Sequence, residues 1–186
     1  MDGIIDRYCW GAFALVWLIA AAFTKPTLRA TGLGTRAASL AMLLVGFYLV
    51  IGDWPRAWLA TPWVPATLPM KLLGVGLTIS GCSFAIWARL ALGRNWSGRP
   101  TVKAEHELVV SGPYALTRHP IYTGILLATF GTMLADSQWQ RILGVLLVTL
   151  GLLMKIRQEE RLMVEAFPKN YPPYQRRVKA LIPGVL

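Results

Sequence analysis

Cysteine, histidine and acidic residues are scarce in this chain of 186 residues. It has two cysteines, two histidines and nine aspartates and glutamates, against 19 lysines and arginines. Both cysteines, Cys9 and Cys82, lie in apolar runs, so we expect packing residues and neither a disulfide framework nor a thiolate metal site. The histidines, His106 and His119, are too far apart in sequence to suggest a zinc site, and no metal is expected.

The sequence also lacks the short motifs of common nucleotide-binding and hydrolytic enzymes. It has no P-loop, no dinucleotide fingerprint in a βαβ setting and no serine nucleophile elbow. Its basic residues flank apolar runs and form no groove with interleaved aromatics, so nucleic acid is not expected as a partner. A nucleotide-like cofactor would have to be bound in some other way.

Charge is low and apolar content is high, which favours a membrane protein. Charged residues are 15% of the chain and hydrophobic residues 55%, too apolar a balance for a soluble surface. The start of the chain carries Asp2 and Asp6 before any base, the reverse of a secretory signal. We therefore expect the first apolar run to remain in the mature protein.

Five apolar segments meet or approach the roughly 20 residues that a helix needs to cross a bilayer. They cover residues 8–24, 37–52, 68–92, 121–135 and 142–156. The last two are so close in sequence that they must form an antiparallel hairpin. The prediction is an all-α membrane protein of about five transmembrane helices, folded as a single domain over residues 1–186.

The distribution of bases predicts the orientation. With the N-terminus outside, most of the 19 lysines and arginines fall on the cytoplasmic side, as the positive-inside rule requires. The net charge of +10 then reflects topology and attraction to anionic membrane lipids. We expect a protein of the cell inner membrane, or an equivalent membrane, with a cytoplasmic C-terminus; the oligomeric state is left open.

Small residues mark one face of the third and of the fourth apolar segment. Such stripes let two helices approach closely, so these two are predicted to pack together and to bring Arg89 near His119. The stripes consist of Gly74, Thr78, Gly81, Cys82, Ala85 and Ala88, and of Gly124, Ala128 and Gly131.

The polar segment 103–124 contains both histidines. Pro120 suits the first turn of a helix, where a missing N–H costs nothing. The free backbone N–H groups of that helix start, together with Arg118, suggest a site for a carboxylate or phosphate.

A second polar segment begins at Lys155, where the fifth helix is expected to leave the membrane. Lys155 and Glu159 are one turn apart, and Glu160 follows. One interpretation is a set of solvated ion pairs followed by an amphipathic tail on the membrane surface. The other, favoured by the arginine–histidine pair opposite, is half of a ligand site.

The motifs of these two segments resemble the isoprenylcysteine carboxyl methyltransferase family, integral-membrane enzymes that use S-adenosylmethionine and are related to phospholipid N-methyltransferases. The resemblance covers roughly residues 95–183; residues 1–67 carry no family signal, and residues 68–186 would form the catalytic part. It rests on the runs His106-Glu107-Leu108-Val109, Ser111-Gly112-Pro113-Tyr114, Arg118-His119-Pro120-Ile121-Tyr122-Thr123-Gly124 and Glu159-Glu160, and on Phe167, Tyr171, Tyr174 and Arg177-Val178.

The resemblance implies a cytosolic cofactor pocket formed by the loop between the third and fourth helices and by the C-terminal segment, with S-adenosylhomocysteine as product. The implied cofactor-binding residues are Lys103, His106, Glu107, Leu108, Val109, Gly112, Pro113, Tyr114, Arg118, His119, Pro120, Tyr122, Glu159 and Glu160. On the substrate side it implies Arg89, Asn95 and Lys155. Lys155 stands where the family tends to have arginine, and a lysine lacks the bidentate fork; Arg89 or Arg157 would then hold a carboxylate acceptor.

The implied reaction is carboxyl O-methylation of a lipid-like or prenylated acceptor by direct in-line transfer. Three alternatives stay open: N-methylation of a phospholipid or another amine, an NADPH-dependent reductase of the membrane sterol type, and a non-catalytic membrane scaffold.

Overall fold

The computed structural model describes residues 2–22, 27–30, 33–52, 58–93, 101–103 and 108–185. Within these residues the chain is almost entirely helical, which confirms the predicted all-α class. The helices are α1 (Asp2–Ala21), α2 (Leu33–Ile51), α3 (Leu68–Leu92), the short 3-10 helix η2 (Gly112–Ala115), α4 (Pro120–Asp136), α5 (Trp139–Ala166) and α6 (Tyr171–Arg177).

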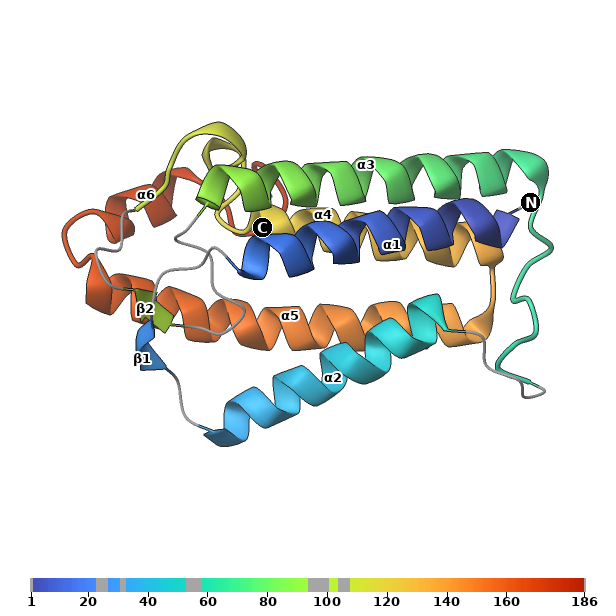
Figure 1. The fold of residues 1–186 in the computed structure, drawn as a ribbon, viewed down its shortest axis with the longest axis horizontal. Coiled ribbons are helices and arrows are strands. Elements are labelled where there is room, and N and C mark those ends of the chain that lie inside the picture. The colour runs from blue at the N-terminus through green and yellow to red at the C-terminus, as the bar shows by residue number, and fades with distance from the viewer. Residues whose placement is uncertain are drawn as a thin grey trace.

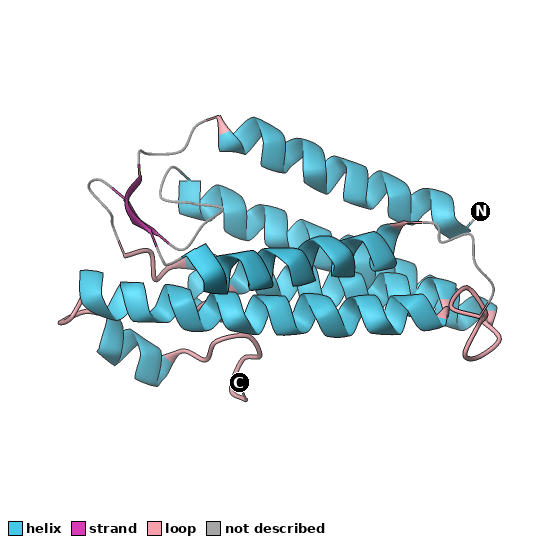
Figure 2. Ribbon diagram, turned by 90° about the horizontal axis from the view of Figure 1, so that it is seen from below, coloured by secondary structure: helices cyan, strands magenta, loops and turns pink. Residues whose placement is uncertain are grey.

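The five long helices form a bundle (Figure 1), in which α3 packs on α4 and α1, and α2 packs on α5. Helix α6 lies at one end of the bundle, and the N-terminus lies at the other. The same end as α6 carries a short antiparallel pair of strands, β1 (Thr27–Ala30) and β2 (Thr101–Lys103) (Figure 2). The sequence did not predict these strands, which join two connections far apart in the chain.

Every predicted span corresponds to a helix of the structure, but α1, α2 and α5 begin or end several residues away from the predicted bounds. Helix α3 has the predicted bounds, and α4 and α5 are joined through Ser137 and Gln138 as the predicted hairpin. Helix α5 continues beyond the predicted span end at residue 156 and includes Glu159 and Glu160, as expected for a helix that leaves the membrane near Lys155. It ends at Ala166, shortly before Pro168. Helix α1 already begins at Asp2.

Two of the described helices, α3 and α5, are long and apolar enough to cross a membrane, and the segment Ala37–Ile51 of α2 is a shorter apolar helix. The protein is therefore treated as a membrane protein. The number of five spans and the orientation remain predictions.

Glycines allow α3 and α4 to touch along their backbones, which confirms the predicted pairing. A Cβ added to Gly124 would lie 2.6 Å from the carbonyl oxygen of Gly81, and one added to Gly74 would lie 2.5 Å from the nitrogen of Ala135. Any larger side chain at these positions would push the two helices apart. This close contact fixes the start of α4 relative to the end of α3.

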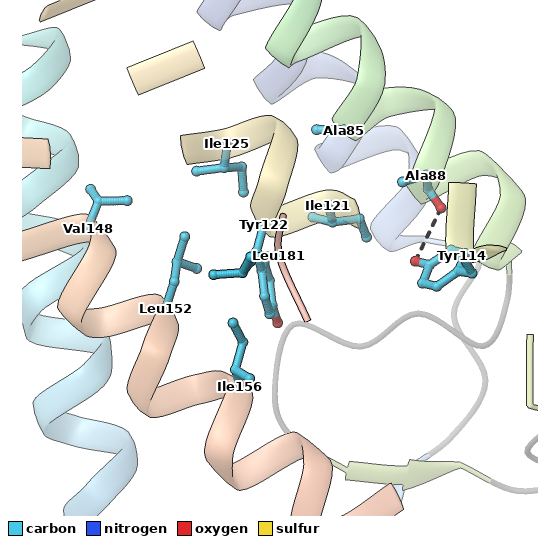
Figure 3. Packing of buried hydrophobic residues seen from close by; sticks show 10 residues of the cluster. All are labelled: Ala85, Ala88, Tyr114, Ile121, Tyr122, Ile125, Val148, Leu152, Ile156 and Leu181. Atoms are coloured by element: carbon cyan, nitrogen blue, oxygen red, sulfur yellow. Dashed lines mark hydrogen bonds between the residues drawn. The ribbon is translucent and has the colours of Figure 1, made fainter. Parts of the chain in front are cut away.

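The main buried cluster lies where α4 and α5 meet and reaches the C-terminal segment (Figure 3). Tyr122 lies beside Leu181 in this cluster, on the side that faces Leu152 and Ile156 of α5. The packed tyrosine ring therefore connects the hydrophobic core with the polar groups that follow it on α5.

Candidate functional site

The candidate site is formed by the start of α4, the C-terminal part of α5 and the segment after α6. Backbone hydrogen bonds attach this last segment to α4: Arg118 N donates to the Lys179 oxygen (2.8 Å) and His119 N to the Ala180 oxygen (3.0 Å). The Thr123 hydroxyl donates to the Leu181 oxygen (2.7 Å). Two backbone amides next to the start of α4 are thus already used within the protein and are not free for an anion.

Arg118 is the centre of a partly buried ion-pair network. Its Nε and Nη2 donate to Glu160 Oε1 at 2.8 and 2.6 Å. Its Nη1 donates to the backbone oxygens of Gln175 (3.0 Å) and Val178. The Gln175 side chain donates to the other Glu160 oxygen at 3.0 Å. Arg118 therefore holds α6 and the tail against α5, an arrangement that suits a guanidinium because it offers several donors in fixed directions.

Glu160 is ionised in this network. Burial opposes ionisation of the carboxyl, but hydrogen bonds from His119 and Arg118, and the charges of both, outweigh burial and lower its pKa to about 2. His119 Nε2 lies 3.3 Å from Glu160 Oε1. Glu160 thus neutralises the Arg118 charge inside the protein.

Glu159 occupies a different environment, one helical position earlier. Its Oε1 accepts a hydrogen bond of 2.6 Å from the Tyr122 hydroxyl, and its Oε2 lies 3.6 Å from His119 Nδ1. The rings of His119 and Tyr122 are parallel, with centroids 5.5 Å apart. The Glu159 side chain is 20% exposed, so this carboxylate remains accessible to a ligand beside two ordered rings.

Lys155 lies one turn before Glu159 on α5. Its ammonium is 4.0 Å from Glu159 Oε1 and 5.3 Å from the centre of the Tyr122 ring. Both contacts are loose, and the side chain is 16% exposed. Lys155 therefore supplies a positive charge next to Glu159 and the Tyr122 ring.

Tyr114 and Tyr174 join the 3-10 helix to α6. The Tyr174 hydroxyl donates to the Tyr114 backbone oxygen at 2.6 Å, and the Tyr114 hydroxyl donates to the Ala88 oxygen at 3.4 Å. Burial raises the pKa of both phenols, that of Tyr174 to about 12. Both hydroxyls therefore remain protonated donors at neutral pH.

Arg89, predicted on the substrate side, is 2% exposed. It donates to the backbone oxygens of Gly93 (2.8 Å) and Ala20 (2.6 Å). These carbonyls lie at the C-terminal ends of α3 and α1, where a positive charge is stabilising. The geometry is that of a residue that joins two helix ends, and contact with an acceptor stays a prediction.

The structure brings most of the described predicted residues together. Arg118, His119, Tyr122, Lys155, Glu159 and Glu160 form one connected group, and Pro120 begins α4 as expected. Leu108 and Val109 pack against buried clusters at the same end, Pro113 is buried, and Gly112 has a positive φ of 59°. Asn95, His106 and Glu107 lie outside the described residues, and of Lys103 only its place at the end of β2 is described.

Two contributors were not expected from the sequence. The Gln175 amide and the carbonyls of residues 178–181 complete the network. Every residue has a backbone carbonyl, so the sequence does not show which carbonyls accept these hydrogen bonds. A glutamine in a polar tail could equally be an exposed surface residue. Among the residues that the structure describes, no three histidine, cysteine or acidic side chains gather as metal ligands.

Comparison with known proteins assigns the family. The isoprenylcysteine carboxyl methyltransferase family profile matches residues 74–165. The cobalt-zinc-cadmium resistance protein CzcN of Cupriavidus metallidurans is 34% identical over 77% of this chain and 58% of its own length. The protein-S-isoprenylcysteine O-methyltransferase B of Arabidopsis thaliana is 28% identical over 60% of this chain and 58% of its own.

The protein-S-isoprenylcysteine O-methyltransferase of Saccharomyces cerevisiae is 30% identical over 64% of this chain and 52% of its own length. The chain thus spans less than two thirds of the length of these relatives. The matched region includes α4 and almost all of α5, with Glu159 and Glu160. By this match and these relatives, the chain belongs to the isoprenylcysteine carboxyl methyltransferase family.

Proposed function

We propose that the chain is an S-adenosylmethionine-dependent methyltransferase that methylates a carboxylate on an amphiphilic acceptor reached from the membrane. The observation that carries the proposal is the position of Glu159. This partly exposed carboxylate is held by Tyr122 and His119 at the junction of two helices that lie within the family match.

The chemistry of this group suits the cofactor. Glu159 is a carboxylate acceptor for the hydroxyl or amino groups of S-adenosylmethionine, and the stacked rings of His119 and Tyr122 offer a flat surface beside it. Arg118 is less suited to the cofactor carboxylate in this arrangement, because Glu160 and two backbone carbonyls occupy its donors. When bound, the cofactor supplies a methyl group already activated on a sulfonium.

The protein then has to bind and orient the cofactor and the acceptor, and to exclude water from the site. Tyr122 and Glu159 fix each other through a short hydrogen bond, and Arg118 holds the tail over the site. Such positioning lowers the barrier of a transfer between two bound reactants. A carboxylate acceptor needs no general base, so the absence of a catalytic triad among the described residues fits O-methylation.

Lys155 is the residue we propose for the acceptor carboxylate. It is more accessible than Arg89, and its ammonium lies 4.0 Å from Glu159 Oε1 and 5.3 Å from the centre of the Tyr122 ring. An acceptor carboxylate bound to the Lys155 ammonium would lie next to Glu159, the side chain that we propose for cofactor binding. Methyl transfer requires the acceptor and the cofactor to lie side by side in this way.

Binding of purified protein to S-adenosylhomocysteine and to NADPH tests the cofactor. We expect S-adenosylhomocysteine to raise the melting temperature and to bind, with affinity lost in Glu159→Gln and retained in Glu165→Gln, whose carboxylate is exposed on the same helix. Stabilisation by NADPH alone would favour the reductase alternative. No binding of either ligand would favour the scaffold alternative.

Transfer to an acceptor is tested with labelled S-adenosylmethionine. The protein is incubated with a membrane lipid extract and, separately, with a prenylated cysteine. A labelled product that is hydrolysed by mild base is a methyl ester, as O-methylation requires. A base-stable product carrying N-methyl groups would assign the chain to amine methylation instead.

A further inference from the structure

A second polar site lies at the end of the bundle opposite α6. A partly open cavity of about 240 Å³ is lined there by residues of α1, α2, α4, α5 and the α4–α5 connection. The end of α4 and the start of α5, which line it, lie on the side of the N-terminus (Figure 1). The polar residues that line it are Asp6, Arg7, Thr132, Asp136, Gln138 and Arg141.

Asp6 is the unusual member of this lining. The residue is 7% exposed, and its Oδ1 accepts no hydrogen bond from the residues that the structure describes. A buried carboxylate oxygen without a donor is costly, and such atoms in folded proteins mark a missing partner. The cavity next to Asp6 is the space in which that partner would lie.

The other polar groups of the lining have partners within the protein. Arg141 forms an ion pair with Asp136 Oδ2 at 2.6 Å and donates to backbone oxygens at the end of α2. The Trp10 indole donates to the Thr132 hydroxyl at 3.1 Å, and that hydroxyl donates to the Ala128 oxygen. The charge of Asp136 is thus balanced by Arg141, which leaves the Asp6 oxygen as the acceptor that a ligand would satisfy.

These features select the chemistry of the ligand. It must donate a hydrogen bond to a carboxylate, and a positive charge would stabilise the ionised form of Asp6. The described residues gather no three metal-ligating side chains there, which argues against a metal ion. Val50, Ile51 and the Trp10 ring favour a small organic group over a hydrated ion.

We infer that this cavity binds a primary ammonium group, with Asp6 as its ion-pair partner. The group could be carried by the headgroup of an aminophospholipid or by a free small amine, and both present the same N–H donors. The cavity is at the opposite end of the bundle from Glu159, so this site is separate from the proposed transfer site and its test does not depend on catalysis.

The first test compares probes on the unaltered full chain in detergent. Ethanolamine carries the ammonium, ethylene glycol replaces it by a neutral hydroxyl, and choline keeps the charge without N–H donors. We expect ethanolamine to bind and raise the melting temperature, with at least tenfold weaker binding of the other two. Equal binding of choline, or no binding of ethanolamine and no retention of aminophospholipid, would overturn the inference. This comparison needs no variant and so cannot fail through misfolding.

The second test assigns the site and the source. Asp6→Asn should weaken ethanolamine binding at least tenfold, while Glu165→Gln, at the other end of α5, should leave it unchanged. Native mass spectrometry from nanodiscs containing phosphatidylethanolamine and phosphatidylcholine distinguishes the two sources. Selective retention of phosphatidylethanolamine, lost in Asp6→Asn, supports a lipid headgroup; ethanolamine binding without such retention supports a free amine. Unchanged binding of both ethanolamine and phosphatidylethanolamine in Asp6→Asn would contradict the assignment of the site to Asp6.

Discussion

The Tyr122 hydroxyl donates a hydrogen bond of 2.6 Å to Glu159, a residue on the neighbouring helix. The bond joins the first turn of α4 to the polar end of α5 and sets the direction of the one carboxylate that we propose for cofactor binding. The orientation of Glu159 therefore depends on a residue whose own ring is packed in the hydrophobic core.

Tyr122→Phe should weaken S-adenosylhomocysteine binding about tenfold, because it removes the hydroxyl that orients Glu159 and keeps the ring in place. Titration calorimetry measures the effect. In a double-mutant cycle with Glu159→Gln, the two changes should be coupled by about 1 kcal/mol, a typical value for one hydrogen bond. Additive effects would mean that Tyr122 does not act through Glu159.

Arg118→Lys should destabilise the protein by about 2 kcal/mol, since a lysine cannot serve Glu160 and the carbonyls of α6 and the tail together. Thermal unfolding in detergent measures the loss. Arg157→Lys is the matched control, because Arg157 is exposed on the same helix as Glu160 and should change stability by less than about 0.5 kcal/mol. Equal effects of the two changes would contradict the proposed clamp.

Stability should fall in acid through Glu160. Its pKa is lowered from 4.5 to about 2 in the folded chain, so its contribution is complete above pH 4.5 and is lost as the pH falls towards 2. Melting temperatures between pH 6 and pH 3 should decline less steeply in Glu160→Gln than in the unaltered chain. Parallel curves would show that Glu160 does not carry the acid dependence.

Lys155→Ala should raise the KM for a carboxylate acceptor by about tenfold or more and leave S-adenosylhomocysteine affinity within about threefold, if Lys155 binds the acceptor. Lys155→Arg should restore acceptor affinity, because a guanidinium binds a carboxylate in two places. Arg161→Ala, at an exposed position of the same helix, serves as the control for a general loss of positive charge. A change confined to cofactor affinity would place Lys155 with Glu159 instead.

Gly81→Ala should destabilise the bundle by about 1–3 kcal/mol, because a Cβ there would overlap the backbone of Ala128 on α4. Gly76→Ala on the same helix is the matched control, since its Cβ would have no atom within 4 Å. Helix propensity alone predicts a small stabilisation at Gly76. Thermal unfolding of both variants separates packing from propensity.

The helices were predictable because apolar runs and stripes of small residues can be recognised directly from the residue types. Helix α3 and the α4–α5 hairpin followed from such patterns, and so did the close contact of α3 with α4. The continuation of α5 through Glu159 and Glu160 was also expected, but its end at Ala166 was not, because apolar composition no longer marks the helix beyond residue 156.

The site was predicted in part for the same reason. His119, Tyr122 and Glu159 carry recognisable side chains, and the structure brings them together. The expectation that Arg118 faces an anionic ligand missed Glu160 and the tail carbonyls, whose positions depend on tertiary folding. The cavity beside Asp6 could not be predicted from the sequence, because an acidic residue before an apolar run is typical of the polar end of any membrane helix.

The tail contacts also set an order of events during synthesis. The start of α4 receives its partners from carbonyls of residues 179–181, about 60 positions later in the chain. While residue 119 emerges from the ribosome, those partners do not yet exist. The site can therefore close only after α5 has been made and the chain has turned back through α6, so a nascent chain halted before residue 179 would contain all of the described acidic and aromatic site residues and still lack the bonds that hold them.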